Sequence, residues 1–268
     1  MISRRRFLIV AGSTAGAVLL GSSQFKKALA SIESEKDPDV PRWAMVVDVD
    51  KCTECMKDLI AKTGNPEVKP PCAVACDREN NVPEFEDPLR DPQWLKILEL
   101  EPEMGGDSFY MPIMCNHCED PPCAQVCLTK ATFKRADGIL MIDYHRCIGC
   151  RYCVIACPYG ARSFNWYDPL EGLKEINPET ERRGHGVVEK CHFCVHRVDK
   201  AVREGVNPIP ACVEACEKRS EELGFGTSLI FGNVKDPNSE ISKFLRETRV
   251  IQLRAELGTK PHVFYKLE

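Results

Sequence analysis

The sequence predicts an α+β fold of four repeated modules, in each of which a short strand leads into a cysteine-bearing loop and a short helix. Sixteen cysteines fall into four groups of four, and every group opens with Cys-x2-Cys and closes with Cys-x3-Cys. A β-like run precedes each group, and a helix-like turn carries each closing pair. Repetition of such a unit indicates packed modules. We expect two halves of two modules each, with long loop insertions and an extended C-terminal tail.

Residues 1–30 are predicted to be an export signal rather than part of this fold. Residues 3–8 read Ser-Arg-Arg-Arg-Phe-Leu, which resembles the twin-arginine pattern Ser-Arg-Arg-x-Phe-Leu, and they lead into an apolar stretch at 7–21. Ala28, Leu29 and Ala30 form a small-x-small cleavage site. An uncleaved anchor helix is the alternative, but the apolar stretch is short for a membrane span and is interrupted by glycine.

Removal of residues 1–30 leaves an acidic chain. The whole sequence has 36 Lys and Arg against 40 Asp and Glu. The first thirty residues hold five of the basic residues and no acidic one, so 31 positive and 40 negative side chains remain, a formal charge of −9. This charge argues against nucleic acid or anionic lipid as a partner. No run of about 18 apolar residues follows position 30, so the mature chain is expected to have no membrane span of its own.

The third cysteine group matches the run of bacterial ferredoxins, Cys-x2-Cys-x2-Cys-x3-Cys-Pro, which holds [4Fe–4S] clusters. There, three thiolates on a tight loop hold one cluster, and the fourth, at the start of a helix, ligates a second. The other groups keep both ends and vary only the middle, so sixteen thiolates predict four [4Fe–4S] clusters. The groups are Cys52, Cys55, Cys72 and Cys76; Cys115, Cys118, Cys123 and Cys127; Cys147, Cys150, Cys153 and Cys157; and Cys191, Cys194, Cys212 and Cys216.

The flanking segments place each module along the chain. We expect the first motif and an insertion in residues 31–110, and a central two-cluster ferredoxin-like domain of βαβ type in 111–184. Residues 185–268 then hold the fourth motif, which pairs with the first in an outer ferredoxin-like domain, and a C-terminal docking tail. The β-like runs are 45–51, 109–114, 139–146 and 186–190, and the helix-like turns are 71–76, 122–127, 153–157 and 211–216.

A zinc- or disulfide-stabilised binding protein is the alternative class. Paired Cys-x2-Cys knuckles suit structural zinc, so the first and fourth groups alone fit it, but zinc explains neither the compact third group nor the matching Cys-x3-Cys ends. Dense disulfides belong to much smaller domains. Covalent haem needs histidine directly after Cys-x2-Cys, and the residues there are Met56, Glu119, Arg151 and Val195.

Histidines and cations lie in or beside the cysteine loops. Because cysteine occupies every ligand position, a Rieske-type centre is not expected. The histidines are predicted to be hydrogen-bond donors near the clusters or surface residues, and the cations either offset cluster charge or are solvated. These residues are His117, His145, His192, His196, Lys51, Arg146, Arg151 and Lys190.

Together the motifs resemble the four-cluster iron–sulfur subunits of bacterial and archaeal respiratory complexes, which include the electron-transfer subunits of dimethyl sulfoxide, polysulfide and tetrathionate reductases and the NrfC proteins. The resemblance extends to residues 76–83, 114–123, 190–194 and 210–216 and to the tail. It implies an electron-transfer subunit with no catalytic residues of its own. Electrons would pass between a quinone-reactive NrfD-like membrane subunit and an extracytoplasmic partner, such as a multihaem cytochrome c.

Within that family the sequence is most similar to the DsrO subunits of DsrMKJOP sulfite-reduction complexes (HmeA in archaea). Its own export signal favours these or NrfC over subunits of molybdopterin oxidoreductases, which commonly cross the membrane bound to a catalytic subunit that carries the signal. The resemblance implies a periplasmic or extracytoplasmic position, held at the membrane by partners. Candidate docking surfaces, or simple cover for the clusters, are 56–71, 77–114 and 217–268. Asp77, Leu128 and Glu217 stand where proline often follows the last cysteine.

The lengths of the four groups suggest how the ligands pair. The two central groups have short middles and the two outer groups have long ones, which suggests two ferredoxin-like halves whose fourth cysteines cross over. The resemblance implies the same arrangement. Four self-contained groups are the alternative. The crossover predicts these ligand sets: Cys115, Cys118, Cys123 and Cys157; Cys147, Cys150, Cys153 and Cys127; Cys52, Cys55, Cys72 and Cys216; and Cys191, Cys194, Cys212 and Cys76.

Overall fold

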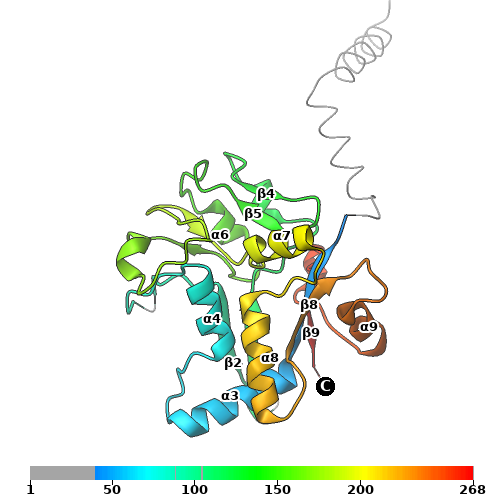
Figure 1. The fold of residues 1–268 in the computed structure, drawn as a ribbon. Helices are drawn as coiled ribbons and strands as arrows, with labels where there is room; N and C mark the ends of the chain where they lie inside the picture. The colour runs from blue at the N-terminus through cyan, green and yellow to red at the C-terminus, as the bar shows by residue number, and fades with distance from the viewer. Residues whose placement is uncertain (1–39, 88, 104, 268) are drawn as a thin grey trace, which may run out of the picture. The chain divides into compact units, whose positions relative to one another are not determined.

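The computed structural model describes residues 40–267 except 88 and 104 (Figure 1). The predicted export signal and its cleavage site lie outside the described residues. From Arg42 onwards the chain forms one compact unit. Across this part of the chain, no helix is long and apolar enough to cross a membrane.

Short helices and short strands are mixed along the described chain, which is compatible with the predicted α+β fold. The helices are α3 (Val49–Thr63), α4 (Pro71–Glu79), α5 (Pro122–Gln125), α6 (Tyr152–Ala156), α7 (Val195–Glu204), α8 (Ala211–Leu223) and α9 (Glu240–Glu247), with 3-10 turns at Pro169–Gly172 and Ala255–Leu257. The strands are β1 (Trp43–Asp48), β2 (Leu95–Leu100), β3 (Phe109–Met114), β4 (Thr132–Lys134), β5 (Leu140–Ile142), β6 (Ser163–Phe164), β7 (Val188–Glu189), β8 (Leu229–Asn233) and β9 (Val263–Lys266).

Strand β1 is the centre of a three-stranded sheet whose other two strands come from the C-terminal tail. It pairs antiparallel with β8 and parallel with β9. Both faces of β1 are buried: Met45 and Val47 join the main core, while Ala44 and Val46 pack with Ile241 of α9. The tail at 217–268 therefore contributes to the core. Its predicted role as a docking surface is a separate question.

Three two-stranded ribbons carry the rest of the chain. Strands β2 and β3, β4 and β5, and β6 and β7 each pair antiparallel. The expected run at 109–114 coincides with β3. The runs expected at 139–146 and 186–190 are longer than the strands that form there, β5 and β7.

Two details of the repeated module differ from the prediction. In the first group, α3 begins directly after β1, capped by the Asp48 side chain, which accepts a hydrogen bond from the Lys51 amide. Cys52 and Cys55 therefore lie on a helix, not on a loop. In the third group, Cys157 was expected at the start of a helix, but α6 ends before it and Cys157 is extended.

Helices that carry closing cysteines pack in pairs. Helix α4 packs against α8, and α5 packs against α6. Figure 1 shows α4 and α8 side by side, although their sequences are far apart. Helices α4 and α8 both start at proline, since Pro70 caps α4, Pro71 is its first residue and Pro210 caps α8. Proline suits the first turn of a helix, where its missing N–H costs no hydrogen bond. The pairing joins the first cysteine group to the fourth and the second to the third.

Candidate functional site

All sixteen cysteines lie in the described residues as free thiols, and ten of them are buried. They gather into four neighbourhoods, which we name after their first members. In each neighbourhood an electrostatic contact links thiols of two groups, as the predicted sets of three cysteines of one group and the last cysteine of another require. The following paragraphs take the Cys52, Cys191, Cys115 and Cys147 sets in turn.

The Cys52 set joins Cys52, Cys55 and Cys72 to Cys216. All four residues line one cavity, together with apolar side chains that include Met56 and Leu229. Burial raises the pKa of Cys52 well above its usual value, and the neighbouring thiols of Cys72, Cys216 and Cys55 raise it further. Arg219 of α8 hydrogen-bonds Cys55, and the Thr227 hydroxyl donates to Cys216 Sγ over 3.8 Å.

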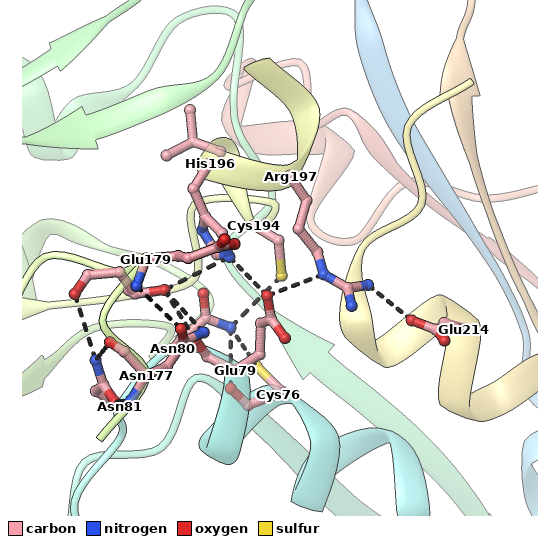
Figure 2. Close-up of polar contacts among 12 residues, drawn as sticks. Cys76, Glu79, Asn80, Asn81, Asn177, Glu179, Cys194, His196, Arg197 and Glu214 are labelled. Carbon is pink, nitrogen blue, oxygen red and sulfur yellow. Dashed lines mark hydrogen bonds and ion pairs between the residues drawn. The ribbon is translucent and has the colours of Figure 1, made fainter. Parts of the chain in front are cut away.

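The Cys191 set joins Cys191, Cys194 and Cys212 to Cys76. Burial raises the pKa of Cys76 well above its usual value, and the neighbouring thiols of Cys212, Cys191 and Cys194 raise it further. Figure 2 shows the Asn80 side chain between two sulfur atoms of this set. Its amide nitrogen donates to Cys194 Sγ over 3.5 Å and to Cys76 Sγ over 3.7 Å. One buried amide therefore links sulfurs from the first and fourth groups.

The Cys115 set joins Cys115, Cys118 and Cys123 to Cys157. Burial, with Cys115 and Cys123, raises the pKa of Cys118 to about 12, against hydrogen bonds from Thr259 and Tyr159. Cys123 interacts electrostatically with both Cys115 and Cys157. The fourth cysteine of the third group thus lies close to a thiol of the second.

The predicted Cys147 set comprises Cys147, Cys150, Cys153 and Cys127. Cys153 interacts electrostatically with Cys147 and Cys127. Burial alone would raise the pKa of Cys127, but hydrogen bonds from Thr132 and Thr129 outweigh it and lower the pKa. Cys150 is the one exposed cysteine of the sixteen, so this set lies nearest to solvent.

The donor chemistry of the four sets fits [4Fe–4S] clusters, since each set offers thiols from one opening loop or helix and one distant closing cysteine. Tetrahedral zinc holds its sulfurs about 3.8 Å apart, given a Zn–S bond of about 2.3 Å. Among the described residues, no three His, Cys, Asp or Glu side chains lie close enough to hold a single metal ion.

The four sets follow one another in a single order through the molecule. Arg162 interacts with thiols of both the Cys147 set and the Cys115 set. Cys191 interacts with Cys115, which joins the Cys191 set to the Cys115 set. Cys212 interacts with Cys72 and Cys216, which joins the Cys191 set to the Cys52 set. The order is Cys147 set, Cys115 set, Cys191 set, Cys52 set.

Comparison with known proteins supports iron–sulfur chemistry for these sets. Residues 107–170 match one family described as a 4Fe-4S dicluster domain, and residues 139–217 match a second family of the same description. The chain is 61% identical over 269 residues to the Hdr-like menaquinol oxidoreductase iron-sulfur subunit 1 of Archaeoglobus fulgidus, an alignment that covers 99% of this chain and 98% of the relative. The chain belongs to the family of iron–sulfur electron-transfer subunits of membrane oxidoreductase complexes.

More distant relatives place it in the same family. The iron-sulfur cluster-binding subunit of menaquinone reductase from Nitratidesulfovibrio vulgaris is 37% identical over 84% of this chain and 88% of the relative. Protein NrfC of Escherichia coli is 32% identical over 83% of this chain and 79% of the relative. The family resemblance, the [4Fe–4S] cofactors and the assignment as a subunit without catalysis of its own are thereby confirmed, as is a fold of tandem dicluster domains. The ligand sets and domain boundaries stay predictions.

The cysteine loops of this family member share one backbone feature. The residue before the second cysteine has a positive φ in three of the four groups: +42° at His117, +68° at Gly149 and +55° at Phe193. Residues that have a side chain disfavour a positive φ, whereas glycine adopts it readily. At Gly149 a Cβ atom would also lie 2.1 Å from the Gly186 oxygen. At the other two positions the His117 and Phe193 rings stack, with centroids 3.7 Å apart.

The histidines near the loops mainly organise the polypeptide. His117 Nδ1 accepts a hydrogen bond from the Leu140 amide, and His192 Nδ1 accepts one from the Val195 amide. His196 pairs with Glu79 over 2.7 Å, and His145 is exposed on the surface. Burial is the largest cause that lowers the pKa values of His117 and His192 well below their usual range.

The four predicted cations divide between core and surface. Lys190 is buried, and its Nζ donates to the main-chain oxygens of Leu140 and Cys191. Lys51 pairs with Asp48, Arg146 pairs with Asp143, and Arg151 lies over the Phe164 and Trp166 rings. Only Lys190 of these four is buried beside the thiols.

Several side chains beside the sulfurs were missed by the sequence analysis. They are Asn80, Tyr159, Arg162, Arg219, Thr227 and Thr259. Asn80 follows Cys76 by one helical turn, a spacing that could have indicated it. Arg219 and Thr227 reach their cysteines through tertiary packing, which no spacing in the sequence reveals.

Proposed function

We propose that the protein holds four [4Fe–4S] clusters on its four thiol sets and relays electrons along their order. The observation that supports this proposal best is the series of electrostatic contacts between thiols of different cysteine groups, which agree with sets of three cysteines of one group and the last of another. Each bound cluster accepts and returns one electron at a time. The polypeptide buries the sulfurs, donates hydrogen bonds to them through Asn80 and Thr227, and leaves Cys150 at the surface.

Anaerobic purification and crystallography test the cluster content and the ligands. We expect about sixteen iron and about sixteen sulfide per chain. Iron anomalous scattering should place Cys157 on the cluster of Cys115, and Cys216 on that of Cys52. A reproducible iron content near twelve would contradict the four clusters. Zinc without iron would overturn the function itself, and Cys157 on the cluster of Cys147 would end the crossover.

We infer further that the protein works within a complex of the Hdr-like menaquinol oxidoreductase or DsrMKJOP type. The relative at 61% identity bears the first of these names. In such a complex the protein would relay electrons between a quinone-reactive NrfD-like membrane subunit and a multihaem cytochrome c or other redox subunit. The alternatives remain NrfC-type nitrite respiration and the molybdopterin oxidoreductases, since a tetrathionate reductase subunit of Salmonella typhimurium is 35% identical over 98% of this chain and 87% of the relative.

The Cys147 set is the end at which we propose contact with the membrane subunit. Around the exposed Cys150, the side chains of Ile148, Tyr152 and Ile155 are also exposed. Contiguous apolar side chains on a surface favour a protein or membrane partner over water. An electron leaving or entering the row of sets would cross the least polypeptide here.

We also propose export by the twin-arginine route and a position at the extracytoplasmic face of the membrane. Replacement of Arg4 and Arg5 by Lys should trap unprocessed protein in the cytoplasm, because this route reads the arginine pair. Immunoblots of cell fractions measure the result. Unchanged processing and location in the variant would contradict this route. Arg6→Lys makes the same change at the open position of the pattern and serves as the control, which should be processed normally.

A further inference from the structure

Arg162 lies between two adjacent thiol sets with its side chain buried. Its Nη2 donates to Cys123 Sγ over 3.0 Å, and its Nη1 donates to the Thr132 hydroxyl over 3.2 Å. The guanidinium also interacts electrostatically with Cys153. Cys123 belongs to the Cys115 set and Cys153 to the Cys147 set, so one side chain contacts a sulfur of each.

The charge of Arg162 is not cancelled by an acid. Within the described part of the chain, its guanidinium forms no ion pair with Asp or Glu, and the groups that raise its pKa most are the thiols of Cys123, Cys153, Cys115 and Cys157. Arg183 shows the contrast: it is equally buried, but its Nε donates to Glu189 over 2.6 Å. A buried ion without an oppositely charged side chain is costly, so the position of Arg162 indicates that the sulfurs themselves supply the negative charge.

We propose that Arg162 raises the reduction potentials of the two clusters on the Cys115 and Cys147 sets together, which rests on the cluster binding proposed above. Reduction adds one negative charge to a cluster, and a nearby cation favours that charge. Burial keeps the field of the cation weakly screened. Net charge and hydrogen bonds to sulfur are among the features that set cluster potentials, and arginine keeps its charge at every physiological pH.

Shared contact has a specific consequence for electron flow. A cation beside one cluster alone would create a step in potential between that cluster and the next. Because Arg162 hydrogen-bonds Cys123 and interacts electrostatically with Cys153, it shifts both clusters in the same direction and keeps their difference small. Electrons that enter at the exposed Cys150 then meet no added barrier before the Cys115 set.

The test is redox potentiometry followed by EPR on the full chain in its complex. In Arg162→Gln, two of the four potentials should fall, each by at least a tenfold change in the equilibrium constant for reduction, which is about 59 mV for one electron. Arg162→Lys keeps the charge and should hold both potentials within a threefold change of the equilibrium constant. Cys118→Ser and Cys150→Ser assign the signals to their sets.

The matched control is Arg151→Gln, which removes an exposed arginine next to Cys150. Water screens that charge, so a shift smaller than the one in Arg162→Gln is expected. Four intact clusters with unmoved potentials in Arg162→Gln would overturn the inference, as would a shift confined to one cluster. If Arg162→Gln fails to assemble, Arg162→Lys still decides: a tenfold fall there overturns the inference. A chain lacking four clusters before any substitution would instead overturn the proposed function.

Discussion

Single polar side chains donate hydrogen bonds to cysteine sulfurs of this protein. Asn80, Thr227, Arg219 and Arg162 each hydrogen-bond a cysteine sulfur from outside the cysteine motifs. Such donors stabilise the more negative form of a sulfur-ligated centre. Asn80, Arg219 and Thr227 each contact a single set, whereas Arg162 interacts with two, so donors can act on one proposed cluster alone or on two together.

Asn80→Ala should lower the reduction potential of the cluster on the Cys191 set and leave the other three unchanged. The substitution removes the amide that donates to Cys76 and Cys194, and it should reduce the free energy of unfolding by about 1–3 kcal/mol. Redox titration and thermal unfolding measure the two effects.

Asn165→Ala is the matched control for this prediction. Asn165 is as buried as Asn80, but its amide donates to Glu189 and the Gly184 oxygen rather than to sulfur. It should destabilise the fold without moving any potential. A potential shift of the same size in both variants would mean that loosened packing, and not the lost hydrogen bond, is responsible.

At the scale of elements, a helix turn separates the two cysteines that serve different sets. Cys72 and Cys76 are one turn apart on α4, and so are Cys212 and Cys216 on α8. Residues four apart lie on the same face of a helix. Because α4 and α8 pack together, each helix presents one cysteine to the Cys52 set and the other to the Cys191 set.

Gly149→Ala should abolish the cluster on the Cys147 set. A Cβ atom there would lie 2.1 Å from the Gly186 main-chain oxygen, and φ is +68°, so the loop must move and its thiols with it. Iron should fall from about sixteen to about twelve per chain, as measured by metal analysis.

Gly160→Ala is the control that distinguishes the contact of the added Cβ from the strain of a positive φ in Gly149→Ala. Gly160 also has a positive φ, of +59°, but no atom lies within 4 Å of a Cβ placed there. That variant should lose about 1–2 kcal/mol of stability and keep its full iron content. Iron loss in both variants would show that positive φ alone, rather than the contact with Gly186, limits the loop.

At the scale of the whole molecule, the four sets differ in their access to solvent. The Cys191 set is wholly buried, whereas the Cys147 set at one end of the row includes the exposed Cys150. The surface around it carries Ile148, Tyr152 and Ile155, whose side chain is 83% exposed. A row of centres with one end at an apolar surface favours docking of a partner at that end.

Ile155→Glu should release the proposed NrfD-like membrane subunit from a tagged chain purified in mild detergent. A charge buried without a partner at an interface opposes association. Immunoblotting and mass spectrometry of the eluate measure the loss. Leu89→Glu, at a side chain 95% exposed and outside the cysteine motifs, should keep the subunit. Retention by both variants would contradict this docking surface, and co-purification of a molybdopterin subunit would favour the alternative complex.

The sequence predicted the chemistry of this protein better than its detailed geometry. Local sequence patterns are short-range constraints, so strand β3 could be located from the β-like run and the four closing segments from the Cys-x3-Cys spacings. The position of Cys52 and Cys55 on α3 could not, because the helix depends on the Asp48 cap and on packing against β3. Arg162 and Arg219 could not be found either, since only tertiary packing brings them to sulfur. The two strands of the C-terminal tail that pair with β1 were not predicted either.

The position of Cys216 beside Cys52 has a consequence for how the protein is made. A ribosome synthesises Cys52, Cys55 and Cys72 early, but Cys216 emerges only after most of the chain. Strand β1 likewise waits for β8 and β9, which follow later still. The Cys115 and Cys147 sets are complete as soon as Cys157 has been added. Biogenesis should therefore run from the middle of the polypeptide outwards, and a nascent chain released before Cys216 would leave its earliest thiols unmatched.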